Sequence, residues 1–178
     1  GYQTISETVA DPVFAALCDT LWTHEILPTV PQPEGEDLPA YTAALLERYR
    51  NPAIRHRTWQ IAMDGSQKLP QRLLGTITDN LASERTIVAL SLAVAAWMRY
   101  IGGTDEKGDP IDVRDPLADH LRKVSDDAPT PAERVEALFE RGRVCLRRRN
   151  QGRDPAQFGV GAGADDDAEA RAAVTTVP

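Results

Sequence analysis

The sequence predicts an all-α protein. Apolar residues recur at intervals of three and four through most of the first 140 residues, the spacing that places them on one face of a helix. Helix start signals precede several of these runs, and the residues from Ile87 to Met98 are apolar except for Ser91. A helix of that composition is normally buried at the centre of a domain. It is too short to span a membrane, which needs about 20 apolar residues.

The individual helices follow from these signals. Asp11 before a proline predicts a helix over residues 12–22, and Asp37 is the expected cap of a helix over residues 38–49. Thr130 with Glu133 three residues later is a capping-box pattern at the start of a further helix. Helices are also expected over residues 52–63 and 69–81, and after the Asp115-Pro116 dipeptide.

A polar elbow is expected at residues 64–68, between two of these helices. Asn51 and the proline after it should open the first helix, because Asn is a good cap and Pro fits the first helical position. Gly65 should end that helix in the left-handed conformation, and Ser66 should cap the next. Composition alone makes Lys68 an ordinary surface lysine near a turn. However, such elbows are also where binding groups are often mounted.

Composition narrows the class of protein. The length of 178 residues fits one globular domain, and the formal charge of -7 argues against a nucleic-acid binder. Cys18 and Cys145 lack CxxC spacing and nearby paired histidines, so they are expected to be reduced thiols of a cytoplasmic protein. The acidic loop at residues 104–112 lacks the ligand pattern of an EF-hand, and no metal site is predicted.

The composition changes at about residue 141. An arginine triplet, a Gly-Ala run and an aspartate triplet then follow one another, as in low-complexity polar segments. The glycines at 159–163 are spaced G-x-G-x-G, and no strand precedes them, so they are not a dinucleotide-binding fingerprint. We therefore expect a helical domain over residues 1–140 and a poorly ordered tail over residues 141–178.

Several stretches of the chain resemble one enzyme family. The run from Asn51 to Arg72, together with residues 10–14, 25–29 and 93–100, resembles the C-terminal domain of the long-chain polyol dehydrogenases. This is the family of mannitol 2-dehydrogenase and fructuronate reductase (D-mannonate oxidoreductase), and the resemblance covers about residues 1–125. It implies a mostly helical domain that forms one wall of a substrate cleft. An N-terminal Rossmann-type domain, which binds NAD(P), would form the other wall.

The resemblance also implies roles for particular residues. Lys68 matches the family's substrate-binding lysine, whose ammonium group hydrogen-bonds the sugar. Gln60 stands where mannitol dehydrogenases carry an arginine, and Arg57, three residues away on the same side of the expected helix, could replace that charge. The stretch from His56 to Gly65 resembles the fructuronate reductase branch more than the mannitol branch. Because that substrate carries a carboxylate, Arg57 and Lys68 would be a suitable pair of cations.

The family's reaction centre is a lysine in a Lys-x4-Asn-x2-His motif, and no lysine of this chain has Asn five and His eight residues on. We therefore expect no catalytic residue here, NAD bound by a domain outside this chain, and no activity of the chain alone. The first hypothesis is the substrate-binding domain of an NAD(P)-dependent polyol or sugar-acid dehydrogenase. Its partners would be the sugar and the Rossmann domain, with no nucleic acid or membrane. The second is a stand-alone helical interaction module or inactive remnant. Which sugar is used, and NAD versus NADP, stay open.

Overall fold

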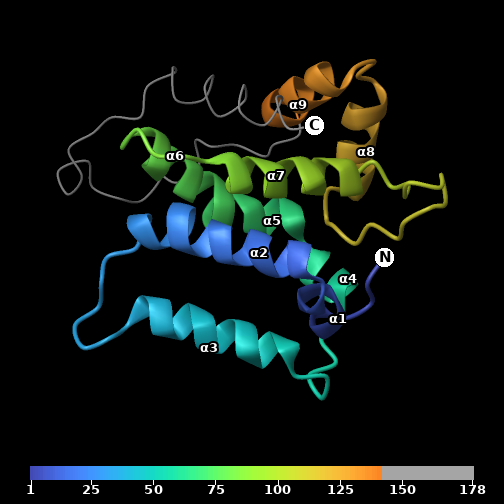
Figure 1. The fold of residues 1–178 in the computed structure, drawn as a ribbon. Helices are drawn as coiled ribbons and strands as arrows, with labels where there is room; N and C mark the ends of the chain where they lie inside the picture. Colours follow the sequence, from blue (N-terminus) through green and yellow to red (C-terminus); the bar gives the residue numbers. More distant parts are fainter. Residues whose placement is uncertain (142–178) are drawn as a thin grey trace. The chain divides into compact units, whose positions relative to one another are not determined.

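The computed structural model describes residues 1–141, and in that range the protein is helical (Figure 1). The described residues contain two isolated β-bridges and no β-strand, which confirms the predicted all-α class. The chain divides into two compact units, Gly1–Met63 and Asp64–Pro178. The predicted tail lies outside the described residues except for Arg141, and so does Cys145.

The first unit is built from short helices. In Figure 1, α2 and α3 run in opposite directions, and α1 packs against both. The carboxylates of Asp11 and Asp37 cap α2 and α3 by accepting hydrogen bonds from the backbone N–H groups of Val13 (2.8 Å) and Ala40 (2.9 Å), as predicted. The elements are α1 (Ile5–Ala10), α2 (Pro12–Thr20), the π-helix η1 (Leu21–Ile26), the 3-10 turn η2 (Leu27–Thr29), α3 (Leu38–Arg50) and α4 (Thr58–Ala62).

The segment between α3 and α4 does not form the helix expected after Asn51. Asn51 instead ends α3, and its side-chain oxygen accepts a hydrogen bond from the N–H of Ala53 at 2.9 Å. Its carbonyl accepts another from the N–H of Ile54 at 3.1 Å, which closes a turn. An Asn-Pro pair suits such a turn as well as a helix start, because Asn bonds its own backbone and Pro fixes φ.

Backbone pairing with the N-terminus keeps the residues after this turn extended. The N–H of Ile5 donates to the carbonyl of His56 at 3.0 Å, and the N–H of Thr58 donates to the carbonyl of Gln3 at 3.1 Å. These bonds form the isolated bridge between Thr4 and Arg57. The expected helix over residues 52–63 is therefore shortened to α4.

A tyrosine-carboxylate pair stabilises the start of the first unit. The hydroxyl of Tyr2 donates to Asp11 at 2.6 Å, and the ring of Tyr2 meets Phe14 edge to face at 5.9 Å. The hydrogen bond from Tyr2, followed by that from the N–H of Val13, lowers the pKa of Asp11, and the same pair raises the pKa of Tyr2. A lowered carboxyl pKa contributes stability that is present above the unfolded pKa and is lost as the pH falls through the folded pKa.

Replacing Tyr2 with Phe should therefore raise the pKa of Asp11 towards its ordinary value, while keeping the ring contact. The melting temperature of the variant should lie below that of the wild type between about pH 4 and pH 10. The difference should disappear in stronger acid, where Asp11 is protonated. An NMR titration of the Asp11 carboxyl measures the first effect and thermal melts at several pH values the second. An unchanged pKa of Asp11 would contradict the assignment.

The second unit begins with three helical segments that follow one another without a break. Pro70 opens the middle one, a π-helix, and because proline lacks an N–H the regular bond to the preceding turn is missing there. Thr130 and Glu133 form the predicted capping box at the start of α9. The elements are α5 (Gly65–Leu69), the π-helix η3 (Pro70–Leu74), α6 (Gly75–Leu81), α7 (Val88–Tyr100), α8 (Ala118–Asp126) and α9 (Pro131–Glu140).

The core of the second unit is centred on α7, which lies between α5 and α9 in Figure 1. The prediction that this helix is buried at the centre of a domain is confirmed, although one side of it is open to solvent, where Val88 is 72% exposed and Leu92 is 38% exposed. Its other faces are buried as expected. The side chains with no exposed surface include members of five segments of the unit: Leu74, Ile77, Leu90, Val94, Leu121 and Leu138.

Candidate functional site

The backbone of the elbow differs from its prediction at one residue. Asp64, not Gly65, adopts the left-handed conformation, with φ 57° and ψ 32°. Aspartate tolerates this region better than most residues do. Gly65 is the first residue of α5, and a Cβ atom built on it would lie 2.0 Å from Nε1 of Trp97. Glycine is required here because the indole ring of Trp97 leaves no room for a side chain, not because the backbone of residue 65 is left-handed.

A carboxylate from a distant loop holds the start of α5. Asp115 accepts hydrogen bonds from the backbone N–H of Ser66 at 2.8 Å and from its hydroxyl at 2.6 Å. The N–H of Asp64 also donates to the carbonyl of Arg114, at 3.0 Å. Two predictions are corrected by these contacts. Ser66 lies inside the helix it was expected to cap, and α8 has no side-chain cap at Leu117, the residue before it.

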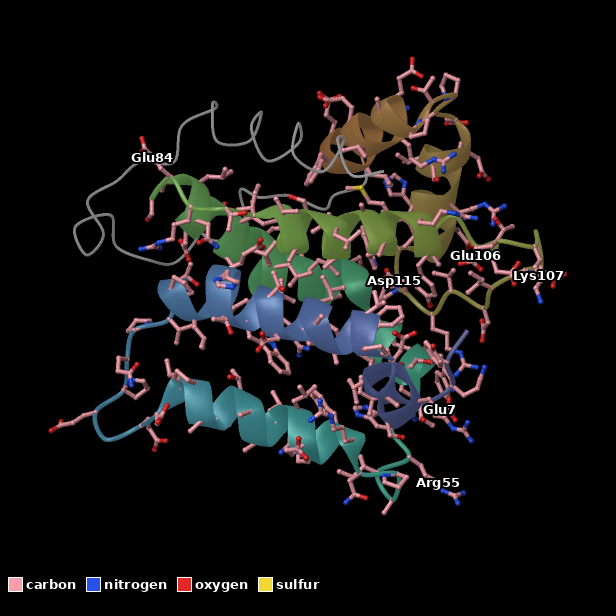
Figure 2. All side chains as sticks on the ribbon, in the orientation of Figure 1. Glu7, Arg55, Glu84, Glu106, Lys107 and Asp115 are labelled. Atoms are coloured by element: carbon pink, nitrogen blue, oxygen red, sulfur yellow. The ribbon has the colours of Figure 1, made fainter. Side chains whose placement is uncertain are left out.

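Asp115 also stabilises the turn before α8. The carboxylate oxygen that accepts the Ser66 hydroxyl accepts a hydrogen bond from the N–H of Leu117 at 2.9 Å as well. The backbone carbonyl of Asp115 accepts one from the N–H of Ala118 at 3.0 Å. Figure 2 shows Asp115 near the base of the loop that follows α7, while Glu106 and Lys107 lie at its tip. The loop tip, residues 106–110, is exposed.

Lys68 lies at the end of the turn that these contacts hold. Its backbone N–H donates to the carbonyl of Asp64 at 3.0 Å, and the N–H of Gln67 donates to the same carbonyl at 3.0 Å. Its side chain is half-buried, and the next residue, Leu69, is 8% exposed. The candidate lysine is therefore mounted on one helical turn whose first residues are fixed from outside.

The loop that contains Asp115 also affects the pKa of Tyr100. Burial raises the pKa of Tyr100, and the nearby charges of Asp112 and Asp115 raise it further. A hydrogen bond from the backbone of Arg114 and the charge of Arg114 act in the opposite direction. The loop that is hydrogen-bonded to the start of α5 thus places the charges of Asp112 and Asp115 near Tyr100, at the end of α7.

The other two candidate residues lie in the first unit. Arg57 directly precedes α4 with an extended backbone, φ -76° and ψ 135°, and its side chain is exposed. Gln60 is an exposed residue of α4, and its N–H donates to the carbonyl of Arg57 at 3.1 Å. The prediction that both lie on the same side of a helix was wrong, because Arg57 is not helical.

Arg57 has an acidic neighbour that the sequence did not suggest. Backbone N–H groups of Gln3 and Thr4 donate to the carboxylate of Glu7 at 2.7 and 3.1 Å. These hydrogen bonds lower the pKa of Glu7, and the charge of Arg57 adds a smaller effect in the same direction. The structure thus brings Arg57 and Gln60 together within the first unit, whereas Lys68 belongs to the second.

The supporting residues Asp115 and Trp97 were missed as members of the site. Asp115 lies 49 residues from Ser66, and the Asp-Pro pair gave only a local signal for a helix start. Trp97 read as an ordinary core residue of α7. Among the described residues, no group of three or more His, Cys, Asp or Glu side chains could hold a metal ion, and no helix there is long and apolar enough to cross a membrane.

Comparison with known proteins identifies the family. Residues 1–144 match the family model of the mannitol dehydrogenase C-terminal domain. The chain belongs to this family. It is 49% identical over 139 residues to D-mannonate oxidoreductase of Escherichia coli K12, an alignment covering 78% of this chain and 28% of that protein. It is 30% identical over 139 residues to mannitol 2-dehydrogenase of Phaeosphaeria nodorum, covering 78% of this chain and 24% of that protein.

A solved structure has the same fold. Mannitol 2-dehydrogenase of Pseudomonas fluorescens, in a ternary complex with NAD and D-mannitol, superposes with a TM-score of 0.71 at 25% identity. The match covers 100% of this chain and 36% of that chain. The mannitol dehydrogenase-like chain therefore spans less than two fifths of these relatives, which are oxidoreductases acting on sugar alcohols or sugar acids by their names.

Proposed function

We propose that this chain is the substrate-binding domain of an NAD-dependent oxidoreductase that interconverts D-mannonate and its keto sugar acid, fructuronate. The observation that carries the proposal is the 49% identity with D-mannonate oxidoreductase, compared with 37% and 30% for two mannitol dehydrogenases. The first and third of these alignments have the same length, 139 residues, so their identities are directly comparable. It favours the sugar acid over the neutral polyol as substrate.

The chemistry of the candidate residues fits an anionic sugar. The ammonium group of Lys68 can donate hydrogen bonds in three directions to hydroxyl or carboxylate oxygens. The guanidinium group of Arg57 can bind a carboxylate with two parallel hydrogen bonds, and the uncharged amide of Gln60 suits a hydroxyl. We assign Lys68 and Arg57 to the carboxylate end of the substrate and Gln60 to a hydroxyl.

The oxidation itself requires groups that this chain does not supply. NAD, when bound, accepts the hydride from the alcohol carbon, and the hydroxyl proton must pass to a base. The Lys-x4-Asn-x2-His motif that provides this base in the family is not present between residues 1 and 178. We therefore propose that an N-terminal Rossmann-type domain contributes both the cofactor site and the base.

The surface of the first unit supports a partner domain. Several of its large apolar side chains are exposed, although such groups usually pack inside a domain. A covering domain would remove them from water, at about 25 cal/mol for each Å² of apolar surface. The most exposed of them are Val13 at 71%, Tyr41 at 61%, Tyr2 at 44%, Ile61 at 43% and Phe14 at 41%.

The test is an activity measurement on the complete polypeptide that the gene encodes. With NAD as acceptor, D-mannonate should be oxidised with a kcat/KM at least about ten-fold above that for D-mannitol, since a hydrogen bond to a charged group contributes about 1.5–3 kcal/mol. NADH absorbance follows both reactions. The isolated 178-residue chain should show no turnover. A preference for D-mannitol would reassign the substrate to the polyols.

The alternative of a stand-alone interaction module or inactive remnant is less well supported, because the family match extends over residues 1–144 and so includes the candidate site. The same measurement separates the two functions. A module or remnant would oxidise neither D-mannonate nor D-mannitol with NAD or NADP, even as the complete gene product.

A further inference from the structure

We propose that Asp115 is a positioning residue for Lys68: its carboxylate fixes the start of α5 and thereby sets where the lysine meets the substrate. The inference rests on the proposed function, since it requires Lys68 to bind the sugar. Asp115 itself is assigned no contact with the substrate.

The first observation is the way the carboxylate of Asp115 is used. One oxygen accepts the N–H of Ser66 at 2.8 Å, and the other accepts the N–H of Leu117 at 2.9 Å and the hydroxyl of Ser66 at 2.6 Å. The backbone N–H groups of Ser66 and Leu117 therefore each need an acceptor, one at each oxygen of the Asp115 side chain. A carboxylate provides this, whereas the nearly isosteric amide of asparagine accepts on one side and donates on the other.

The second observation is the short path from Asp115 to Lys68. α5 is the first turn of the helical run from Gly65 to Leu81, and Pro70 has no N–H to bond a carbonyl of that turn, so the turn is joined less tightly to the helix that follows. The Asp64 carbonyl accepts the N–H groups of Gln67 and Lys68, each at 3.0 Å. The N–H of Asp64 is itself bound to the carbonyl of Arg114 at 3.0 Å. The Arg114 carbonyl thus holds Asp64 and the Asp115 carboxylate holds Ser66, so both residues at the start of the turn are bound to the same loop.

The third observation is that Trp97 limits the alternatives. Its side chain is 8% exposed and lies against Gly65, so the turn cannot shift towards α7. The indole of Trp97 and the carboxylate of Asp115 therefore restrict the backbone position of Lys68 from two sides. Loss of the carboxylate hydrogen bonds would free the turn to move away from α7, and the ammonium group would move with it.

The test compares variants of the complete gene product in D-mannonate oxidation. Asp115→Asn should raise KM for D-mannonate by about ten-fold, the loss expected when a backbone donor faces an amide donor. It should change kcat less than three-fold on the same reasoning, because the reacting groups lie on other residues. Amide hydrogen exchange at Ser66 and Lys68 should accelerate. Asp109→Asn is the matched control, since Asp109 is an exposed carboxylate of the same loop, and the KM of that variant should not change.

A double variant distinguishes positioning from general stabilisation. In a Lys68→Met background, Asp115→Asn should have no further effect on KM, because the residue it positions is absent. If Lys68→Met raises KM and Asp115→Asn does not, the inference is wrong and the proposed function stands. An equal rise in KM with and without Lys68 also overturns it. If Lys68→Met leaves KM unchanged, the proposed role of Lys68 is wrong, and the inference fails with it.

Discussion

Gly65→Ala is expected to lower the free energy of unfolding of the second unit by about 2 kcal/mol. The added Cβ would lie 2.0 Å from Nε1 and 2.7 Å from Cδ1 of Trp97, well inside contact distance. The ring is 8% exposed and cannot move into solvent without opening the core. Overpacking costs about 1–3 kcal/mol or more, while the better helix propensity of alanine returns at most about 1 kcal/mol. Urea denaturation followed by circular dichroism measures the difference.

A second substitution shows whether the indole is the cause. Trp97→Val removes Nε1 and Cδ1, the two atoms closest to a Cβ on residue 65, and leaves an apolar side chain that ends at its Cγ atoms. Nε1 of Trp97 has no hydrogen-bond partner among the described residues, so the replacement sacrifices no bond there. In the Trp97→Val background, Gly65→Ala should cost less than about 1 kcal/mol, which is a coupling expected only for residues in contact. Equal costs in both backgrounds would refute the packing explanation.

Gly65 also shows which parts of the fold could be predicted. The caps at Asp11, Asp37 and Thr130 were predicted correctly because each depends on residues within three positions of the cap. The glycine in the elbow was expected for its backbone freedom, whereas its requirement comes from Trp97, 32 positions away by the residue numbers. A sequence pattern does not record which distant side chain approaches a backbone.

The prediction of a helix start at Asn51, after α3, was wrong for a related reason. The Asn51-Pro52 pair is compatible with a helix start and with a turn, and local chemistry does not choose between them. The choice follows from pairing between residues 3–5 and residues 56–58, which keeps Arg57 extended. Nothing in the spacing of either segment indicates that they meet.

The candidate site was predicted from family resemblance more than from chemistry. The residues around Lys68 are ordinary for a turn, and its proposed role came from the motif in which it lies. The residues that hold it could not be found in this way, because the contact from Asp115 to Ser66 joins positions 49 apart. Sequence alone therefore gave the candidate binding groups, and the structure added the groups that orient one of them.

The largest functional effect is expected from removing the charge of Lys68. Lys68→Met keeps most of the side-chain stem and deletes the ammonium group, so the kcat/KM for D-mannonate should fall by about 10- to 100-fold, the equivalent of one hydrogen bond between charged groups. The effect on a neutral polyol should be smaller, because no carboxylate is involved. Lys107→Met is the matched control: Lys107 lies at the exposed tip of the loop after α7 (Figure 2), and its replacement should change neither substrate.

Arg57 provides an independent check on the nature of the substrate. If both cations bind the carboxylate, Arg57→Met should also raise KM for D-mannonate by about ten-fold and affect D-mannitol less. Arg55→Met is the control, since Arg55 is an exposed arginine two residues earlier in the same extended segment (Figure 2). If the Lys68 and Arg57 variants lose the sugar acid and the polyol equally, the two cations do not read the carboxylate. The domain would then bind its substrate through hydroxyl groups alone.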